Sequence, residues 1–116
     1  MKTFKPQDNK TEETPWGSLT WYTSKELGNT ETMTVGKCRI NVGDMNPRHS
    51  HPNCEEVIHV LKGRIIHTYN NEEMIMEEGD TICIPVGVPH NARNIGDQVV
   101  ELAIAFSSAE RKTEPV

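Results

Sequence analysis

The sequence GDMNPRHSHPNCEEVIHVLKG, residues 43–63, sets two histidines and a glutamate between two glycines. His49 and His51 are separated by one residue, so on a strand both rings project from the same face. Their backbone positions then lie roughly 6.6 Å apart, from which two imidazole nitrogens can converge on one ion. Glu56 follows a short turn, and we expect its carboxylate to return to the same face on the next strand. The stretch therefore predicts part of a metal site.

A second stretch, GDTICIPVGVPHNARN over residues 79–94, supplies another imidazole. His90 follows two prolines and a glycine, which predict a tight bend that aims its ring inward. Three imidazoles and one carboxylate make a mixed nitrogen and oxygen donor set, which suits Fe, Mn, Ni, Cu, Co or Zn better than Ca or Mg. We therefore predict one divalent transition metal, without distinguishing among these six, held by His49, His51, Glu56 and His90.

Short segments of alternating apolar and polar residues, separated by Gly, Pro and Asn turns, surround both stretches. The expected strands cover residues 18–23, 32–42, 55–61, 64–69, 74–76, 81–84 and 99–106. Turns recur roughly every 8–12 residues and no window shows a helical period, which is typical of an all-β sandwich or barrel. Closing a sheet into a barrel also suits a chain whose hydrophobic content is only 34%.

Taken together, the two stretches resemble the two motifs of the cupin family. The first motif, G(X)5HXH(X)4E(X)6G, and the second, G(X)5PXG(X)2H(X)3N, are filled at every fixed position, by Gly43, His49, His51, Glu56, Gly63, Gly79, Pro85, Gly87, His90 and Asn94. The resemblance implies a double-stranded β-helix, or jelly-roll barrel, with one bound metal. The neighbouring Glu55 would be the ligand if the gap were three residues, but the spacing to Gly63 favours Glu56. We expect Asn94 to close a turn and not to bind metal.

The length of 116 residues predicts one compact domain over residues 15–116. Residues 1–14 are polar and mixed in charge, and we expect a flexible arm that becomes ordered only against a neighbouring subunit. Small single-domain cupins usually pair, so the resemblance implies a homodimer.

Composition argues against several kinds of partner. The net charge is −5 and the 12 basic residues are scattered, which disfavours nucleic acid binding. No stretch approaches the roughly 20 apolar residues of a membrane span, and no apolar run near the start is typical of a signal peptide. Three cysteines without CxxC spacing argue against a disulfide framework, so we expect a reducing cytoplasm, with Cys38 and Cys83 as buried thiols and Cys54 as a loop bystander.

Other polar residues are expected to lie away from the metal. His59 and His67 are interpreted as barrel-exterior or interface residues, and Arg48, Arg93 and Arg39 as surface or ion-pairing residues. Strand parity with the ligands instead favours an apolar inward row of Ile58, Val60, Ile82, Ile84 and Ala92. No inward-facing Lys or Arg and no second acid or base is evident.

Three functional hypotheses follow for a small-molecule ligand. The first is a mononuclear metal-dependent enzyme, a dioxygenase or related oxidoreductase or lyase, acting on a small oxygenated organic molecule. The second is an isomerase or epimerase of a sugar or sugar acid. The third is a non-enzymatic module that binds a small molecule, since fold alone does not determine function. No catalytic residue is assigned.

Overall fold

The computed structural model describes residues 1–116 and contains eleven strands and one short 3-10 helix. No helix in it is long and apolar enough to cross a membrane. The elements are η1 (Pro6–Asp8), β1 (Lys10–Thr14), β2 (Gly17–Thr23), β3 (Thr34–Ile40), β4 (His49–Ser50), β5 (Glu56–Lys62), β6 (Ile65–Tyr69), β7 (Glu72–Met76), β8 (Thr81–Ile84), β9 (His90–Asn94), β10 (Val100–Phe106) and β11 (Glu114–Pro115). The all-β prediction is confirmed.

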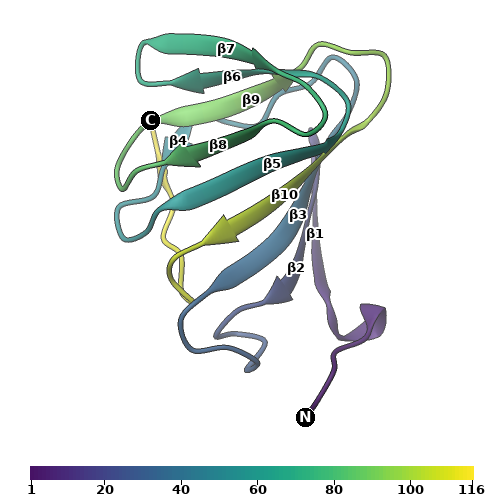
Figure 1. Cartoon of the computed structure of the whole chain (residues 1–116), viewed down its shortest axis with the longest axis vertical. Coiled ribbons are helices and arrows are strands. Elements are labelled where there is room, and N and C mark those ends of the chain that lie inside the picture. Colours follow the sequence, from purple (N-terminus) through teal and green to yellow (C-terminus); the bar gives the residue numbers. More distant parts are fainter.

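Two antiparallel sheets form the molecule (Figure 1). The larger sheet has the strand order β1-β2-β3-β10-β5-β8, and the smaller has the order β11-β4-β9-β6-β7. Neighbours in each sheet are often distant in sequence: β10 lies between β3 and β5. This crossing between sheets brings residues 49–56 and 90–94 close together in space.

Apolar side chains alternate along each central strand, so that one face of each sheet is buried. On β10, Val100, Leu102, Ile104 and Phe106 are buried, whereas the residues between them are partly exposed. The predicted inward row is also found: Ile58, Val60, Ile84 and Ala92 are buried, and Ile82 packs against the same core. The core lies between the two sheets, and some of its side chains also line the cavity that contains the candidate site.

The N-terminal segment differs from the expected flexible arm. Lys10–Thr14 forms β1 and pairs with β2 over the full register from Lys10–Trp21 to Thr14–Gly17. The charged residues of this strand lie at the edge of the sheet, where side chains of any polarity are accommodated because they face solvent. Because these residues are polar and show no apolar alternation, the strand could not be predicted from the sequence.

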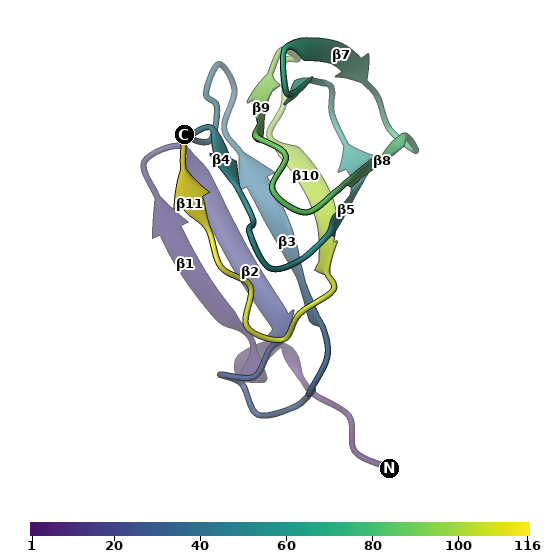
Figure 2. The same cartoon turned by 90° about the vertical axis from the view of Figure 1, so that its left-hand side faces the viewer.

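The C-terminal segment, residues 107–116, was not predicted to carry structure. It leaves β10, turns back and adds β11 to β4 at the edge of the smaller sheet, through the pairs Glu114–Ser50 and Pro115–His49. Figure 2 shows this yellow segment running between β1 and β4. We call residues 107–116 the C-terminal strap.

The cysteines follow the prediction only in part. Cys38 is buried on β3 and Cys54 is buried in the loop before β5. The prediction of a buried Cys83 is wrong, because that thiol is exposed. Cys83 pairs with Val57, an exposed residue of β5, so alternation places both on the outer face of the larger sheet.

Two turn glycines offer a matched test of this fold. Gly63 and Gly79 both have φ near +90°, but a Cβ on Gly63 would lie 2.7 Å from Cγ2 of Val100, whereas a Cβ on Gly79 would meet nothing within 4 Å. We expect Gly63→Ala to lower the free energy of unfolding by about 1–2 kcal/mol more than Gly79→Ala, since both variants are strained in the backbone but only the first adds a clash. Urea denaturation of the two variants measures the difference, and equal losses would contradict the predicted contact.

Candidate metal centre

Four side chains from three parts of the chain converge at one end of the barrel. His49 begins β4, His51 directly follows it, Glu56 begins β5 and His90 begins β9. His49 and His90 are direct partners across the β4–β9 pair. One ligand atom from each of the four residues lies within 4.8 Å of the others. The structure thus brings together the four residues that the sequence predicted as ligands.

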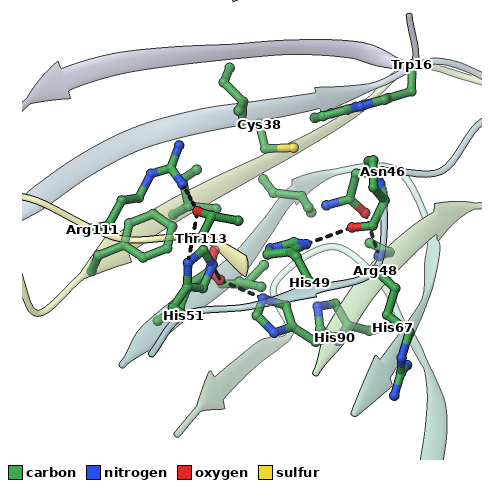
Figure 3. Close-up of a pocket in the computed structure, with 18 of the residues that line it drawn as sticks. Trp16, Cys38, Asn46, Arg48, His49, His51, His67, His90, Arg111 and Thr113 are labelled. Atoms are coloured by element: carbon green, nitrogen blue, oxygen red, sulfur yellow. Dashed lines mark hydrogen bonds and ion pairs between the residues drawn. The ribbon is translucent and has the colours of Figure 1, made fainter. Parts of the chain in front are cut away.

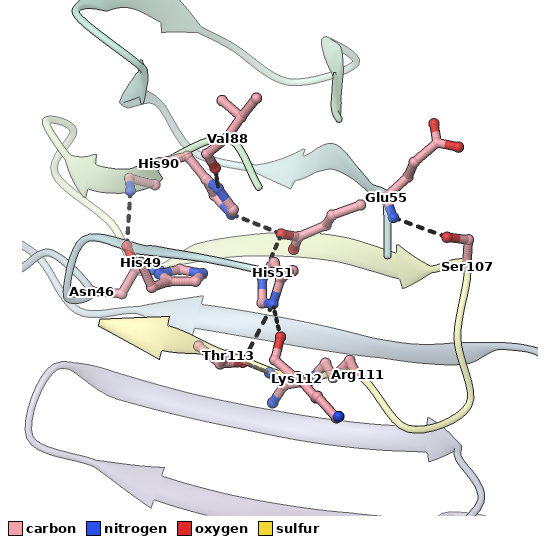
Figure 4. Close-up of polar contacts among 12 residues, drawn as sticks. Asn46, His49, His51, Glu55, Val88, His90, Ser107, Arg111, Lys112 and Thr113 are labelled. Carbon is pink, nitrogen blue, oxygen red and sulfur yellow. Dashed lines mark hydrogen bonds and ion pairs between the residues drawn. The ribbon is translucent and has the colours of Figure 1, made fainter. Parts of the chain in front are cut away.

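The three imidazoles are held in one tautomer by backbone carbonyls. Nδ1 of His49 lies 2.7 Å from the Pro47 carbonyl. Nδ1 of His90 lies 2.9 Å from the Val88 carbonyl, and Nδ1 of His51 lies 2.8 Å from the Lys112 carbonyl (Figure 4). A carbonyl oxygen can only accept, so each Nδ1 carries a proton and donates it. In the neutral ring the Nε2 lone pair is then free for a metal, and histidines that bind metals are commonly oriented by such a bond from the other ring nitrogen.

The fourth group, the Glu56 carboxylate, tests whether a cation fits. Its Oε1 lies 2.9 Å from Nε2 of His90 and 3.2 Å from Nε2 of His51, all buried. Nε2 of His51 makes no hydrogen bond. Lone-pair nitrogens this close to a carboxylate repel unless a positive charge lies among them. A divalent transition metal removes this conflict and suits the donor set, so the residues fit the predicted metal.

Electrostatics favour the ligating form of Glu56. Burial acts to raise the pKa of this carboxyl, but in the metal-free protein the His51 and His90 rings, when they carry the positive charge of a proton, outweigh burial and hold the pKa at about 2. Burial also lowers the pKa of His49 to about 4. At neutral pH the carboxylate is therefore charged and the His49 ring is neutral, as metal coordination requires.

The ligands form one wall of a cavity of about 380 Å³. Much of the remaining wall is apolar and aromatic, including Trp16, Leu19, Leu102, Ile104 and Phe106. Figure 3 shows the three ligand imidazoles together, with Trp16 and Cys38 on the far side of the space. Of the predicted apolar row only Ile58 and Ala92 line the cavity, so its apolar surface comes mainly from other residues. The cavity is large enough for a small organic molecule.

The interpretation of His67 as an exterior residue is wrong. Its side chain is 1% exposed and lines the cavity, with its ring stacked on His90 at a centroid distance of 5.8 Å. The β6 strand begins with the buried Ile65, so alternation sends His67 to the same inner face. That apolar residue is the signal that could have located it.

The expectation of no inward arginine is also wrong, because Arg111 of the C-terminal strap lines the cavity. Arg48 also borders the cavity, but its guanidinium donates to Oγ1 of Thr68 and to the exposed Asn70 carbonyl, which agrees with the expected surface role. Nothing in the local sequence around Arg111 indicates its direction, since the strap has no apolar alternation. Its placement depends on the pairing of β11 with β4.

The other residues set aside from the site lie outside it. Glu55 is exposed, in contrast to the buried Glu56, as alternation predicts. His59 is bonded to Oγ1 of Thr81 at 2.8 Å, away from the ligands. Arg93 and Arg39 are exposed, and Arg39 lies 3.9 Å from the Glu101 carboxylate. Asn94 contacts backbone groups only and is not a ligand.

The buried His67 predicts how stability depends on pH in the metal-free protein. Burial, followed by the nearby His90, lowers its pKa from 6.5 to about 4. The folded state then binds fewer protons than the unfolded state between these values, so stability is complete above pH 6.5 and declines as the pH falls toward 4. We expect a loss on the order of 3 kcal/mol from this residue. Urea denaturation at pH 7 and pH 4.5 measures it, and the variant His67→Phe should lose less; equal stability at both pH values would contradict the buried neutral ring.

Fold and site together define a small metal-binding β-barrel. A family model described as a cupin domain matches residues 36–106, more than half of the chain. This protein therefore belongs to the cupin family, and its jelly-roll architecture agrees with that membership. Among curated relatives, germin-like protein 3-8 of Oryza sativa subsp. japonica is 32% identical over 85 residues, covering 69% of this chain and 38% of the relative.

Solved structures show the same fold in longer chains. Oxalate decarboxylase of Lactobacillus farciminis, in a formate complex, superposes with a TM-score of 0.89 at 24% identity, covering 97% of this chain and 35% of that one. Oxalate decarboxylase of Bacillus subtilis, described with Mn(II) centres, gives 0.87 at 19% identity, covering 97% and 31%. This chain thus spans well under half the length of these relatives, and the likeness to the solved structures concerns the fold.

Proposed function

We propose that this cupin is a mononuclear metal-dependent enzyme, a dioxygenase or related oxidoreductase or lyase, that acts on a small oxygenated organic molecule. The observation that carries the proposal is the set of three imidazoles held by backbone carbonyls with Nε2 turned toward Glu56. Because the rings are already oriented, less conformational entropy is lost when a metal binds. Such preorganisation is typical of functional metal sites.

The chain's own residues define what a substrate meets. Four protein ligands leave about two positions free on an octahedral ion, enough for a substrate with two oxygen donors. The bound metal would supply Lewis acidity or bring oxygen to that substrate. The apolar wall excludes water from the opposite side of the cavity, and His67 supplies a neutral imidazole on the inner face beside His90.

The same wall argues against the second hypothesis. A sugar or sugar acid carries many hydroxyl groups, and each one buried without a partner is costly. Trp16, Leu19, Leu102 and Ile104 offer no side-chain oxygen acceptor to satisfy them, so most of these hydroxyls would depend on a few polar lining residues such as Asn46 and Thr113. A non-enzymatic binding module would have the same cavity, so only turnover separates it from an enzyme.

Metal content and turnover test the proposal. Protein purified without a His tag is analysed for transition metals, and then screened for O₂ uptake and CO₂ release with oxalate, 2-oxo acids and aromatic diols. We expect about one transition metal per chain and a turnover that is lost with chelator and restored by metal. Turnover that survives complete metal removal would overturn the proposal. So would a result in which every compound that binds is recovered without chemical change.

We also propose that the protein is a homodimer. The outer face of the larger sheet exposes Val57 (41%) and Leu61 (50%) on β5, beside the exposed Cys83 of β8. A second copy that covers these side chains would remove apolar surface from water. Light scattering at micromolar concentration should give twice the mass of the 13.1 kDa chain, and a monomer would contradict the proposal.

A further inference from the structure

Arg111 places a positive charge in an otherwise apolar part of the cavity. Its guanidinium carbon lies 4.3 Å from the centre of the Trp21 ring and 5.2 Å from that of Phe106, so the group packs against two aromatic faces. Such packing stabilises a cation but supplies no negative charge. The strap and β2 therefore hold the guanidinium at a defined position.

No protein carboxylate forms an ion pair with this cation. The ion pairs of the structure involve Lys10, Lys25, Lys37, Arg39, Arg64, His51 and His90, and Arg111 is in none of them. Its one protein hydrogen bond runs from Nη1 to Oγ1 of Thr113, at 2.7 Å. A guanidinium has five N–H donors, so most of them remain available to a ligand. Burial lowers the pKa of Arg111, and the more distant Glu56 and Glu12 carboxylates oppose this shift only in part, so a bound anion would offset it further.

The position of Arg111 relates it to the metal centre. Oγ1 of Thr113, which accepts its hydrogen bond, lies 3.3 Å from Nδ1 of His51. Figure 3 shows Arg111, Thr113 and His51 side by side, and His67 lies on the other side of His90. Arg111, Trp21 and Thr113 also line a second hollow, which Lys25 and Glu110 border as well, so these three residues lie between this hollow and the metal cavity. A small molecule in the cavity thus contacts the metal-binding residues on one wall and the Arg111 guanidinium on the adjacent wall.

We propose that Arg111 binds the carboxylate of the substrate, and that this substrate is a monocarboxylate with an apolar body. A guanidinium binds a carboxylate through two parallel hydrogen bonds, which a neutral amide cannot reproduce. The body lies against Trp16, Leu19 and Leu102, in a cavity of about 380 Å³ that exceeds what a two-carbon diacid fills. That the bound carboxylate is a substrate rests on the proposed function. Its binding to Arg111 does not require that the protein be an enzyme.

Binding to the metal-free protein separates the two proposals. Chelator-treated protein is titrated with 3-phenylpropionate, with 3-phenylpropionamide and with acetate, by calorimetry and by tryptophan fluorescence. Both tryptophans of the chain, Trp16 and Trp21, line the cavity, so their emission reports its occupancy. We expect the acid to bind at least about tenfold more tightly than the amide, because of its charge-assisted bonds, and more tightly than acetate, because of its apolar body.

Variants assign this preference to Arg111. Arg111→Met should weaken the acid about tenfold or more and remove the preference over the amide, and Arg111→Lys should retain only part of it. Arg93→Met is the matched control, since Arg93 is exposed and makes no ion pair, and it should bind as the wild type does. Thermal unfolding of each variant checks the fold, and the comparison of acid with amide on the wild type needs no variant.

Three results would overturn the inference: equal binding of acid and amide, an unchanged preference in Arg111→Met, or no binding of either carboxylate up to about 10 mM. Each result would indicate that Arg111 has only a structural role, in which it packs the C-terminal strap against Trp21. If the preference depends on Arg111 but no metal-dependent turnover is found, the proposed function fails and the carboxylate site stands. If metal-dependent turnover is found without the preference, the carboxylate site fails and the proposed function stands.

Discussion

Replacing His51 by alanine is expected to weaken divalent metal binding by at least about a hundredfold. Even the loss of a group that only orients a ligand typically costs 10- to 100-fold in metal affinity, and His51 offers a ligand nitrogen itself. The change also leaves the buried Glu56 carboxylate without one of the two imidazoles beside it. Competition with a chelator of known affinity, using Mn²⁺ and Zn²⁺, measures the loss.

His59→Ala is the matched control for this experiment. His59 is the same residue type on β5, and its ring is bonded to Thr81 and not to the ligand set. We expect its metal affinity to equal that of the wild type. If His51→Ala kept its affinity, or if His59→Ala lost as much, the site would have been assigned to the wrong residues.

Replacing Asn94 by alanine is expected to lower the free energy of unfolding by about 3 kcal/mol. The buried Nδ2 group donates to the Ile40 and Gln98 carbonyls at 3.0 and 2.8 Å, and Oδ1 accepts from the Gly96 N–H at 2.9 Å. Alanine leaves these backbone groups without partners, and each unsatisfied buried group costs about 1–3 kcal/mol. For a domain of this size the loss corresponds to a Tm about 10 °C lower or more.

Asn71→Ala provides the comparison for this second prediction. Asn71 is exposed in the turn between β6 and β7 and its side chain makes no hydrogen bond, so its loss should change Tm by little. Scanning calorimetry of the two variants in chelator measures folding apart from metal binding. A similarly small change for Asn94→Ala would show that water replaces its three bonds.

The ligand set could be predicted from the sequence because its geometry is local. His49 and His51 share a face through alternation alone, and the spacing of Glu56 and His90 within their motifs is matched at every fixed position. Asn94 was likewise predicted to close a turn, and its bond to the Gly96 N–H does so. The apolar inward row followed from the same alternation.

Other residues were misplaced where alternation was not applied or where composition was misleading. Ile65 would have placed His67 on the inner face, and the inward Ile82 and Ile84 would have placed Cys83, which lies between them, on the outer one. The polar residues of β1 hid a strand, because an edge strand exposed to solvent needs no apolar pattern.

By itself, then, the sequence determined the all-β fold and the four residues of the metal centre, since both depend on spacings of a few residues along a strand or turn. Only the tertiary structure decided what surrounds that centre. The Lys112 carbonyl that orients His51 is a backbone group without a side-chain signature, and Arg111 reaches the cavity because β11 adds to β4. Contacts between segments about 60 residues apart depend on how the sheets close, which no local pattern specifies.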